Sequence, residues 1–386
     1  MTWTKTDSAK QKRQFIEDFK RDRYDSFTAL CDHFNVSRET GYELCRAYDE
    51  RGEAAFESAS RRPLNSPQAM GPAVEARIIE LRTAHPTWGA RKILALLEHR
   101  YPRSYWPVAS SIGDLLRRRG LTHPQRRRAT SAPFSQPLGH CRAANEVWCT
   151  DFKGWFLTRD GKRCNPLTLT DADSRMLLRC THVPRGNVGN VKPIFEAAFR
   201  EFGMPLAMRS DNGPPFASNG VAGLSRLACW WVRLGIWPER IEPGCPEQNG
   251  RHERMHRTLK EEVTDHPEAN ARLQQRAFDR FRSEYNNERP HEALGQRPPA
   301  SIYKPSPRPF PKRLPEIEYP SGVLVRTVRT TGEIRFEGDT WFLGEALEAE
   351  RVAVWETERG WEVYFSTILL ARFDPRTKRL VRNPKP

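Results

Sequence analysis

The stretch Val147-Trp148-Cys149-Thr150-Asp151-Phe152 decides the fold, because one carboxylate interrupts an otherwise apolar run of strand-forming residues. Val, Trp, Thr and Phe are enriched in β-strands, so this stretch predicts a buried strand. A carboxylate in such a strand is costly unless it is paired, hydrogen-bonded or bound to a metal ion. Asp151 is therefore a candidate site residue.

The sequence that follows predicts an α/β sandwich. Strand-like runs occupy 167–170 and 176–181, a helix is expected at about 189–202, and a short strand at 206–210. Three strands in a meander followed by alternating helix and strand are typical of an α/β sheet covered by helices.

Two further acids occupy positions that suit a site at the edge of this sheet. Asp211 follows a strand, and the turn-forming Asn212-Gly213-Pro214 leaves it at the carboxyl end, where ligand sites of open α/β sheets lie. Glu253 opens a helix. Each acid alone is more often a turn former or a helix cap. Together they suit hard cations such as Mg²⁺ or Mn²⁺, and two such ions about 3.5–4 Å apart can serve both oxygens of a phosphoryl displacement.

The helix after Glu253 has two different faces. Met255, Leu259 and Val263 are spaced as a buried stripe. The other face is expected to carry Glu253, His256, Arg257 and Lys260, which suits a metal site over DNA. The alternative is that Arg257 only pairs with Glu253. The nearby Asp171 and Asp173 are expected to shape a turn, and Glu261 and Glu262 to be solvated.

The N-terminal third reads as two helical units. In 9–56, an apolar helix and a turn at Asn35-Val36 lead to Ser37, a good N-cap for a helix at 38–51. This resembles a helix-turn-helix that presents Arg38, Thr40, Glu43 and Arg46 to a major groove; a plain helical bundle is the alternative. A second helical unit is expected at about 72–121, followed by six arginines in 117–128 that are suited to track phosphates.

The C-terminal region is predicted to be a small all-β barrel or sandwich, because short strands with turn signals fill 322–374. The fold class is thus N-terminal all-α helix-turn-helix units, a central α/β core and a C-terminal all-β barrel. The predicted boundaries are a helix-turn-helix domain at 1–57, a linker at 58–71, a second helical DNA-binding domain at 72–123, a basic linker at 124–142, the core at 143–300, a Pro-rich linker at 301–320, a β domain at 321–376 and a basic tail at 377–386.

Composition favours a polyanionic partner. The chain has 63 Lys and Arg against 48 Asp and Glu, a formal charge of +15, and cations that neutralise phosphates release condensed counterions. Membrane surfaces are also anionic, but no apolar run reaches the roughly 20 residues of a membrane span, and the N-terminus lacks the apolar region of a signal peptide. A cytoplasmic, nucleoid-associated protein is expected. The eight dispersed cysteines lack zinc-ligand spacing, so no zinc is expected.

Several motifs in order resemble the DDE insertion-sequence transposases, whose core is similar to that of retroviral integrases and has an RNase H-like fold. The matching stretches are Trp148-Cys149-Thr150-Asp151, Ser210-Asp211-Asn212-Gly213-x-x-Phe216, Pro243-x-x-Pro246-x-Gln248-Asn249-Gly250-x-x-Glu253, the run 285–299 and the pre-core run 85–93. The resemblance implies that Asp151, Asp211 and Glu253 are the catalytic metal ligands. The chain departs from retroviral integrases in the 41 residues between Asp211 and Glu253, with the extra length expected at 219–238, and in lacking their N-terminal zinc domain.

The resulting expectation is a transposase that cleaves element ends and joins them to target DNA, using two Mg²⁺ or Mn²⁺ ions. Double-stranded DNA is the expected partner, with at least a dimer on DNA and no membrane. A DNA-binding regulator with a dead core and an RNase H-like nuclease without strand transfer are the alternatives; intact acids argue against the first and the long N-terminus against the second. The predicted DNA contacts are Arg38, Thr40, Arg46, Arg91, Lys92, Arg126, Arg127, Arg128, Asn212, Asn249, His256, Arg257 and Lys260.

Overall fold

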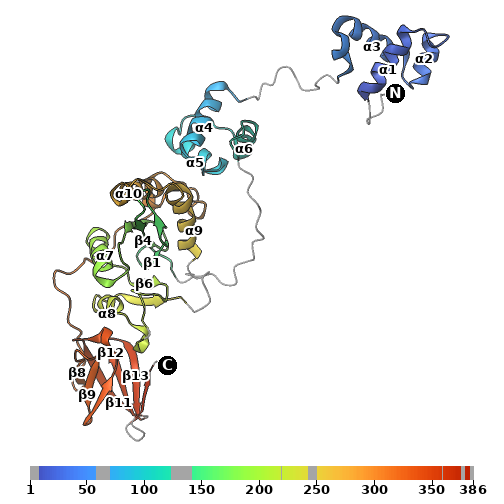
Figure 1. The fold of residues 1–386 in the computed structure, drawn as a ribbon. Coiled ribbons are helices and arrows are strands. Elements are labelled where there is room, and N and C mark those ends of the chain that lie inside the picture. Colours follow the sequence, from blue (N-terminus) through green and yellow to red (C-terminus); the bar gives the residue numbers. More distant parts are fainter. Residues whose placement is uncertain are drawn as a thin grey trace. The chain divides into compact units, whose positions relative to one another are not determined.

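A computed structural model describes residues 8–57, 70–122, 141–218, 220–241, 250–358, 360–374 and 379–382. The chain divides into two compact units, Met1–Met70 and Gly71–Pro386 (Figure 1). No helix among the described residues is long and apolar enough to cross a membrane.

The first unit is a small helical bundle with a helix-turn-helix. It contains α1 (Ser8–Lys20), α2 (Phe27–His33), α3 (Arg38–Arg51) and the 3₁₀ turn η1 (Gly52–Phe56). Ser37 accepts a hydrogen bond from the backbone N–H of Thr40 and so caps α3, as the sequence predicts. Gly41 allows close packing, because a Cβ there would lie 2.9 Å from the Cys31 sulfur. The expected helix-turn-helix is confirmed, and α3 is free to present its exposed face.

The second unit begins with three helices, α4 (Pro72–Ala84), α5 (Ala90–Arg100) and α6 (Ala109–Arg118). Their shared core is formed by Ile78, Ile93, Leu97 and Ile112, all fully buried. Arg82 closes the bundle by donating to the carbonyl oxygens of Trp88 and Leu121.

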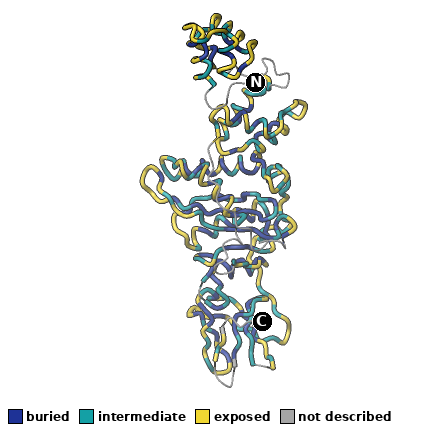
Figure 2. The backbone as a smooth tube through the Cα atoms, turned by 90° about the vertical axis from the view of Figure 1, so that its right-hand side faces the viewer, coloured by how far each residue is buried: buried dark blue, intermediate teal, exposed yellow. Residues whose placement is uncertain are grey.

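A five-stranded sheet of order β5-β4-β1-β6-β7 forms the centre of this unit. β1 (Val147–Phe152) pairs antiparallel with β4 (Pro166–Asp171), which pairs antiparallel with β5 (Leu177–His182), whereas β6 (Ala207–Ser210) and β7 (Trp237–Arg240) run parallel to β1. The short strands β2 (Phe156–Leu157) and β3 (Arg163–Cys164) form a hairpin. Figure 2 shows the buried residues concentrated along the strands of this sheet. The α/β core predicted from the sequence is confirmed.

Helices cover both faces of the sheet. On one face lie α7 (Val188–Phe202) and α8 (Arg226–Arg233), whose apolar residues share a cluster with Trp148 and Leu169. On the other lie α9 (Gly250–Leu259), its π-helical continuation η4 (Lys260–Thr264) and α10 (Ala271–Asn287), which pack with Leu177 and Cys180. The remaining 3₁₀ turns are η2 (Val221–Gly223), η5 (Glu292–Leu294) and η6 (Pro299–Ser301).

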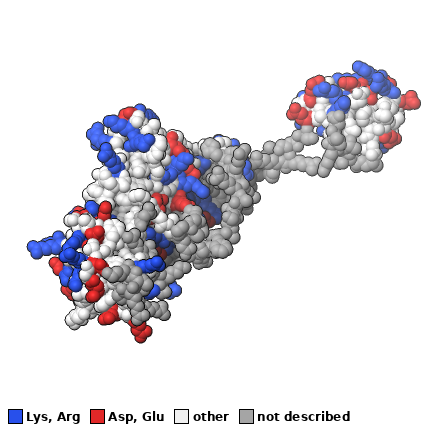
Figure 3. Space-filling view, turned by 60° about the horizontal axis from the view of Figure 1, so that its bottom comes forward, with Lys and Arg blue, Asp and Glu red and all other residues white. Residues whose placement is uncertain are grey.

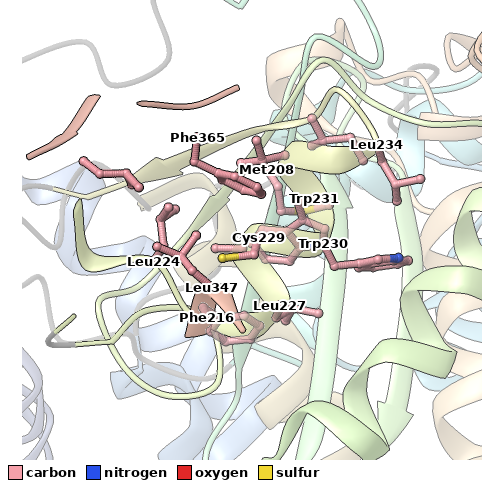
Figure 4. Packing of buried hydrophobic residues seen from close by; sticks show 14 of the residues in the cluster. Met208, Phe216, Leu224, Leu227, Cys229, Trp230, Trp231, Leu234, Leu347 and Phe365 are labelled. Atoms are coloured by element: carbon pink, nitrogen blue, oxygen red, sulfur yellow. The ribbon is translucent and has the colours of Figure 1, made fainter. Parts of the chain in front are cut away.

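The stretch 219–238, where the extra length is expected, is largely regular secondary structure among its described residues. Its described residues form η2, α8 and the first half of β7, and so help to complete the sheet and cover one of its faces. Trp231 is fully buried against Phe195 and Phe216, and Trp230 contacts Phe199 (Figure 4). Burial of two indole rings explains why this added length is ordered, since each contributes a large apolar area.

The Pro-rich stretch expected to be a linker is held along the core. The Ser306 N–H donates to the carbonyl of Phe202, and the Arg308 guanidinium donates to the carbonyls of Pro205, Leu234 and Gly235. Gly203 makes this possible, because at its φ of +73° a Cβ would lie only 2.5 Å from the Ser306 carbonyl oxygen.

The C-terminal strands form antiparallel sheets. One has the order β14-β13-β12-β11-β8 and the other pairs β10 with β9. The elements are β8 (Leu324–Thr327), β9 (Glu333–Phe336), β10 (Asp339–Phe342), η7 (Glu345–Leu347), β11 (Arg351–Thr357), β12 (Gly360–Phe365), β13 (Ile368–Asp374) and β14 (Arg379–Arg382). The described strands do not close on themselves, so the predicted barrel is not confirmed. Leu347 and Phe365 belong to the same apolar cluster as Trp231 of α8 (Figure 4).

Candidate active site

Asp151 lies on the middle strand of the sheet, directly opposite Thr168 of β4. Paired residues point to the same face, which is the one that α9 covers, and the Asp151 side chain is 24% exposed. Burial first, and then the negative charges of Asp211 and Glu253, raise the pKa of this carboxyl to about 7. A buried carboxyl beside other carboxyls ionises readily only when a positive charge is near.

Asp211 lies directly after β6, the strand parallel to β1. Burial raises the pKa of its carboxyl, against a hydrogen bond from the Gly213 backbone that lowers it. Its Oδ1 atom is buried and accepts no hydrogen bond from any described residue. A buried oxygen without a donor is costly, so Oδ1 is suited to a ligand.

Glu253 stands in the first turn of α9 and its side chain is exposed. The segment that leads into this helix, including Asn249, lies outside the described residues. Because the charge of Glu253 acts on Asp151, the carboxyl groups of β1, β6 and α9 share one neighbourhood. Within the described parts of the chain, no three Asp, Glu, His or Cys side chains already stand at metal-binding distances.

These carboxylates fit a divalent metal in the chemistry of their donor set. Mg²⁺ and Mn²⁺ prefer oxygen ligands from carboxylates, and the unsatisfied Oδ1 of Asp211 is such a ligand. Asp151 and Asp211 would hold the ion from adjacent parallel strands, with Glu253 approaching from the helix.

A cleft of mixed charge adjoins the acids. It is lined by Lys153, Glu253, His256, Arg257, Lys260, Glu261 and Asp265. Arg257 and Lys260 are exposed, as expected for residues that contact DNA. On the face seen in Figure 3, Lys and Arg side chains are intermixed with Asp and Glu.

His256 lines the same cleft as Glu253, Arg257 and Lys260, as their helical spacing predicts, but unlike them it is buried. Its ring is buried, with Nε2 at 2.7 Å from the Thr168 hydroxyl and Nδ1 at 3.9 Å from Asp151 Oδ2. Burial and the charge of Lys153 lower the pKa of His256 to about 3. The His256 ring points toward the sheet because the Thr168 hydroxyl on β4 is a hydrogen-bond partner for the imidazole.

The pre-core motif contacts the core rather than a free surface. His85 stacks on Trp88 and bonds Glu284 at 2.8 Å, and the Thr87 hydroxyl donates to Glu262 at 2.5 Å. Glu262, expected to be solvated, is an acceptor here and also pairs with the buried Arg289.

Two of the predicted DNA contacts, Lys92 and Arg91, lie in this motif and differ in exposure. Lys92 is partly buried, and burial together with the charge of Arg289 lowers its pKa to about 8. Its contact with DNA stays a prediction. Arg91 remains exposed and pairs with Glu292 at 3.0 Å.

The other predicted residues are distributed as follows. Arg38 and Arg46 are exposed on α3, and Thr40 is partly buried with its hydroxyl bonded to that of Ser37. Asn212 is exposed and donates to the carbonyl of Ile241. Arg126, Arg127, Arg128 and Asn249 lie outside the described residues. Asp171 is buried and accepts from Ser174 and from the Asn145 N–H, which confirms its expected role in a turn.

Two residues of the site escaped sequence reasoning, Thr168 and His252. Both are buried and bonded to each other at 2.7 Å. A signal was present: Thr168 and Thr170 alternate on one strand face, and His252 and His256 are one helical turn apart.

Comparison with known families agrees with this fold. Residues 142–246 and 234–299 each match an integrase core domain, and residues 40–116 match a homeodomain-like domain. The central domain is an integrase core. The two integrase core matches together contain Asp151, Asp211 and Glu253.

Curated relatives are proteins of insertion elements. An uncharacterized 39.2 kDa protein of insertion element IS476 from Xanthomonas euvesicatoria is 29% identical over 239 residues, which are 60% of this chain and 64% of that protein. A 31.7 kDa protein of IS407 from Burkholderia multivorans is 28% identical, covering 59% of this chain and 79% of that one. The transposase InsD of IS2 from Escherichia coli is 26% identical over 55% of this chain and 72% of its own.

Solved integrases are more distant. The catalytic core of HTLV-2 integrase, in complex with magnesium, aligns with 42% of this chain and 97% of its own at 16% identity and a TM-score of 0.34. A simian T-cell lymphotropic virus intasome chain aligns with 78% of this chain at 16% identity, covers all of its own length and has a TM-score of 0.36.

Proposed function

We propose that this chain is an insertion-element transposase that cuts the ends of its element and joins them to target DNA. The observations that support the proposal are that the charges of Asp211 and Glu253 act on Asp151 within an integrase core and that a buried oxygen of Asp211 has no hydrogen-bond donor among the described residues. The transposase InsD of IS2, a relative over more than half of this chain, supports it.

The proposed cofactor is a pair of Mg²⁺ or Mn²⁺ ions. Such a pair activates the attacking oxygen and stabilises the leaving oxygen of an in-line phosphoryl transfer. The protein's part is to hold the acids deprotonated and in place: the unsatisfied Oδ1 of Asp211 is available for coordination, and Asp151 ionises once positive charge offsets the burial that raises its pKa.

Exposed cations next to the acids are suited to hold the scissile strand. Arg257 and Lys260 lie in the same cleft as Glu253, and Lys153 follows β1 directly. They would neutralise phosphates and place the DNA backbone over the carboxylates. Water would attack first and a DNA 3′-hydroxyl second, each entering the same cleft.

Recognition of the element ends is assigned to the helix-turn-helix of the first unit. Arg38 and Arg46 are exposed on α3, which would enter the major groove. Pairing two ends requires at least two copies of the chain during the reaction, and the working location would be the nucleoid.

The test uses the DNA sequences that flank the coding region, assayed for Mg²⁺-dependent cleavage and joining. Asp211→Asn and Glu253→Gln should abolish both steps while leaving DNA binding unchanged. Asp173→Asn is the matched control, because it removes the same charge from a nearby turn, and it should retain activity. An active Asp211→Asn variant would disprove the assignment, and cleavage without joining would favour a nuclease.

A further inference from the structure

A chain of hydrogen bonds connects α9 to the strand that carries Asp151. The Thr168 hydroxyl lies 3.0 Å from the carbonyl oxygen of Asp151, 2.7 Å from His252 Nε2 and 2.7 Å from His256 Nε2. On its other side, the His252 ring meets the Thr170 hydroxyl at 2.8 Å through Nδ1. Thr168, His252 and His256 are all buried.

Proton counting fixes the direction of these bonds. A backbone carbonyl oxygen can only accept a hydrogen bond, so the Thr168 hydroxyl donates its one proton to the Asp151 carbonyl oxygen. The Thr168 oxygen then accepts from both imidazoles, which donate from Nε2.

The same bonds set the position of Glu253, which follows His252 in the first turn of α9. The helix is attached on one side through Thr168 to the backbone of Asp151. On the other side the Arg251 guanidinium donates to the Ala172 carbonyl at 3.0 Å. The separation of the Asp151 and Glu253 carboxylates therefore depends on these polar contacts and not only on apolar packing.

We infer that Thr168, His252 and His256 are positioning residues, whose hydrogen bonds hold α9 against β1 and set the geometry of the metal-binding carboxylates. The inference rests on the proposed function, because it presumes that the three acids bind a divalent ion. None of these three residues is proposed to touch the metal or the DNA.

Thr168→Val tests the inference, because it removes the hydroxyl at nearly constant volume. Mn²⁺ binding to the full chain without DNA would be followed by electron paramagnetic resonance. Loss of a residue that orients metal ligands typically weakens metal binding about 10–100-fold, so a loss of about tenfold or more is expected. Thr168→Ser keeps the hydroxyl and should stay within about twofold of the wild type.

His256 provides an independent variant. His256→Phe fills the same space without a donor and should weaken Mn²⁺ binding as Thr168→Val does, whereas His256→Gln keeps a nitrogen donor near Nε2 and should restore most of it. Nitrogen NMR of labelled histidines should show both rings protonated at Nε2 in the wild type.

The outcomes separate this inference from the proposed function. If Asp211→Asn loses Mn²⁺ binding but Thr168→Val binds as the wild type does, the positioning role is wrong and the metal site stands. If Asp211→Asn also binds as the wild type does, the metal site itself is wrong. Melting temperatures measured alongside expose a purely structural role, which would lower stability and leave Mn²⁺ affinity unchanged.

Discussion

Replacing Arg289 by Met should destabilise the second unit, because it leaves the carboxylate of Glu262 with too little positive charge. The Arg289 side chain is 9% exposed and that of Glu262 is 17% exposed. Removing one partner of a fully buried pair costs about 3–5 kcal/mol. Glu262 retains the Thr87 hydroxyl and the nearby charge of Lys92, so we expect a smaller loss of about 2–3 kcal/mol.

Differential scanning calorimetry would measure this loss as a fall in the transition of the second unit of roughly 4–12 °C, at about 2–4 °C per kcal/mol for a unit of this size. Arg289→Met with Glu262→Leu should recover part of the loss, since no buried charge is then left alone. The matched control is Arg91→Met in the same interface, whose pair with Glu292 is 75% exposed on both sides and should change stability by less than about 1 kcal/mol. Equal effects of Arg289→Met and Arg91→Met would refute the reasoning.

Three further predictions follow from the structure. Gly203→Ala should lower the free energy of unfolding by more than about 2 kcal/mol, because the left-handed backbone is strained for alanine and its Cβ would meet the Ser306 carbonyl oxygen at 2.5 Å. Urea denaturation measures this loss. The control is Gly52→Ala, also at positive φ but in open space, which should cost less. His291→Gln should reduce acid sensitivity: burial lowers the folded pKa of His291 to about 3, below the unfolded value of about 6.5, so its stability contribution is present above pH 6.5 and is lost as the pH falls, by up to about 2 kcal/mol near pH 5. The check is the melting temperature of the wild type and of His291→Gln at about pH 5 and pH 7.5. If the wild type loses no more stability on acidification than His291→Gln does, the reasoning is wrong. Arg46→Ala should weaken binding to element-end DNA. It should also reduce the slope of the logarithm of the binding constant against the logarithm of the salt concentration by about one unit, and an unchanged slope would mean that α3 does not contact the phosphates.

The sequence predicted those elements whose local pattern agrees with their packing. The strand 147–152 was expected from β-propensity, and α3 from its Ser37 cap, and both have the bounds that the sequence suggested. Met255, Leu259 and Val263 are buried, as their helical spacing required. In these cases residues near each other in the chain carry the information, so no knowledge of distant segments is needed.

The burial and contacts of other residues could not be predicted from the sequence, because segments distant in the chain determine them. His256 has the helical spacing of an exposed residue, but Thr168, 88 positions earlier, draws its ring inward. Glu262 would be solvated on an isolated helix, but Thr87 and Arg289 cover it. Trp230 and Trp231 looked like part of an insertion, and only the sheet and α7 give them an apolar surface to cover.

Asp151 illustrates the difference between what the sequence determined and what only the tertiary structure decided. The sequence alone determined that a carboxylate stands in a buried strand and that two more acids follow in an order typical of integrase cores. Only the tertiary structure decided that their charges act on one another, that Oδ1 of Asp211 lacks a donor, and that Thr168 and two histidines hold the third acid's helix in place. The reason is physical: backbone propensity and burial are local properties, whereas electrostatic coupling and hydrogen-bond satisfaction depend on distances between segments that only folding brings together.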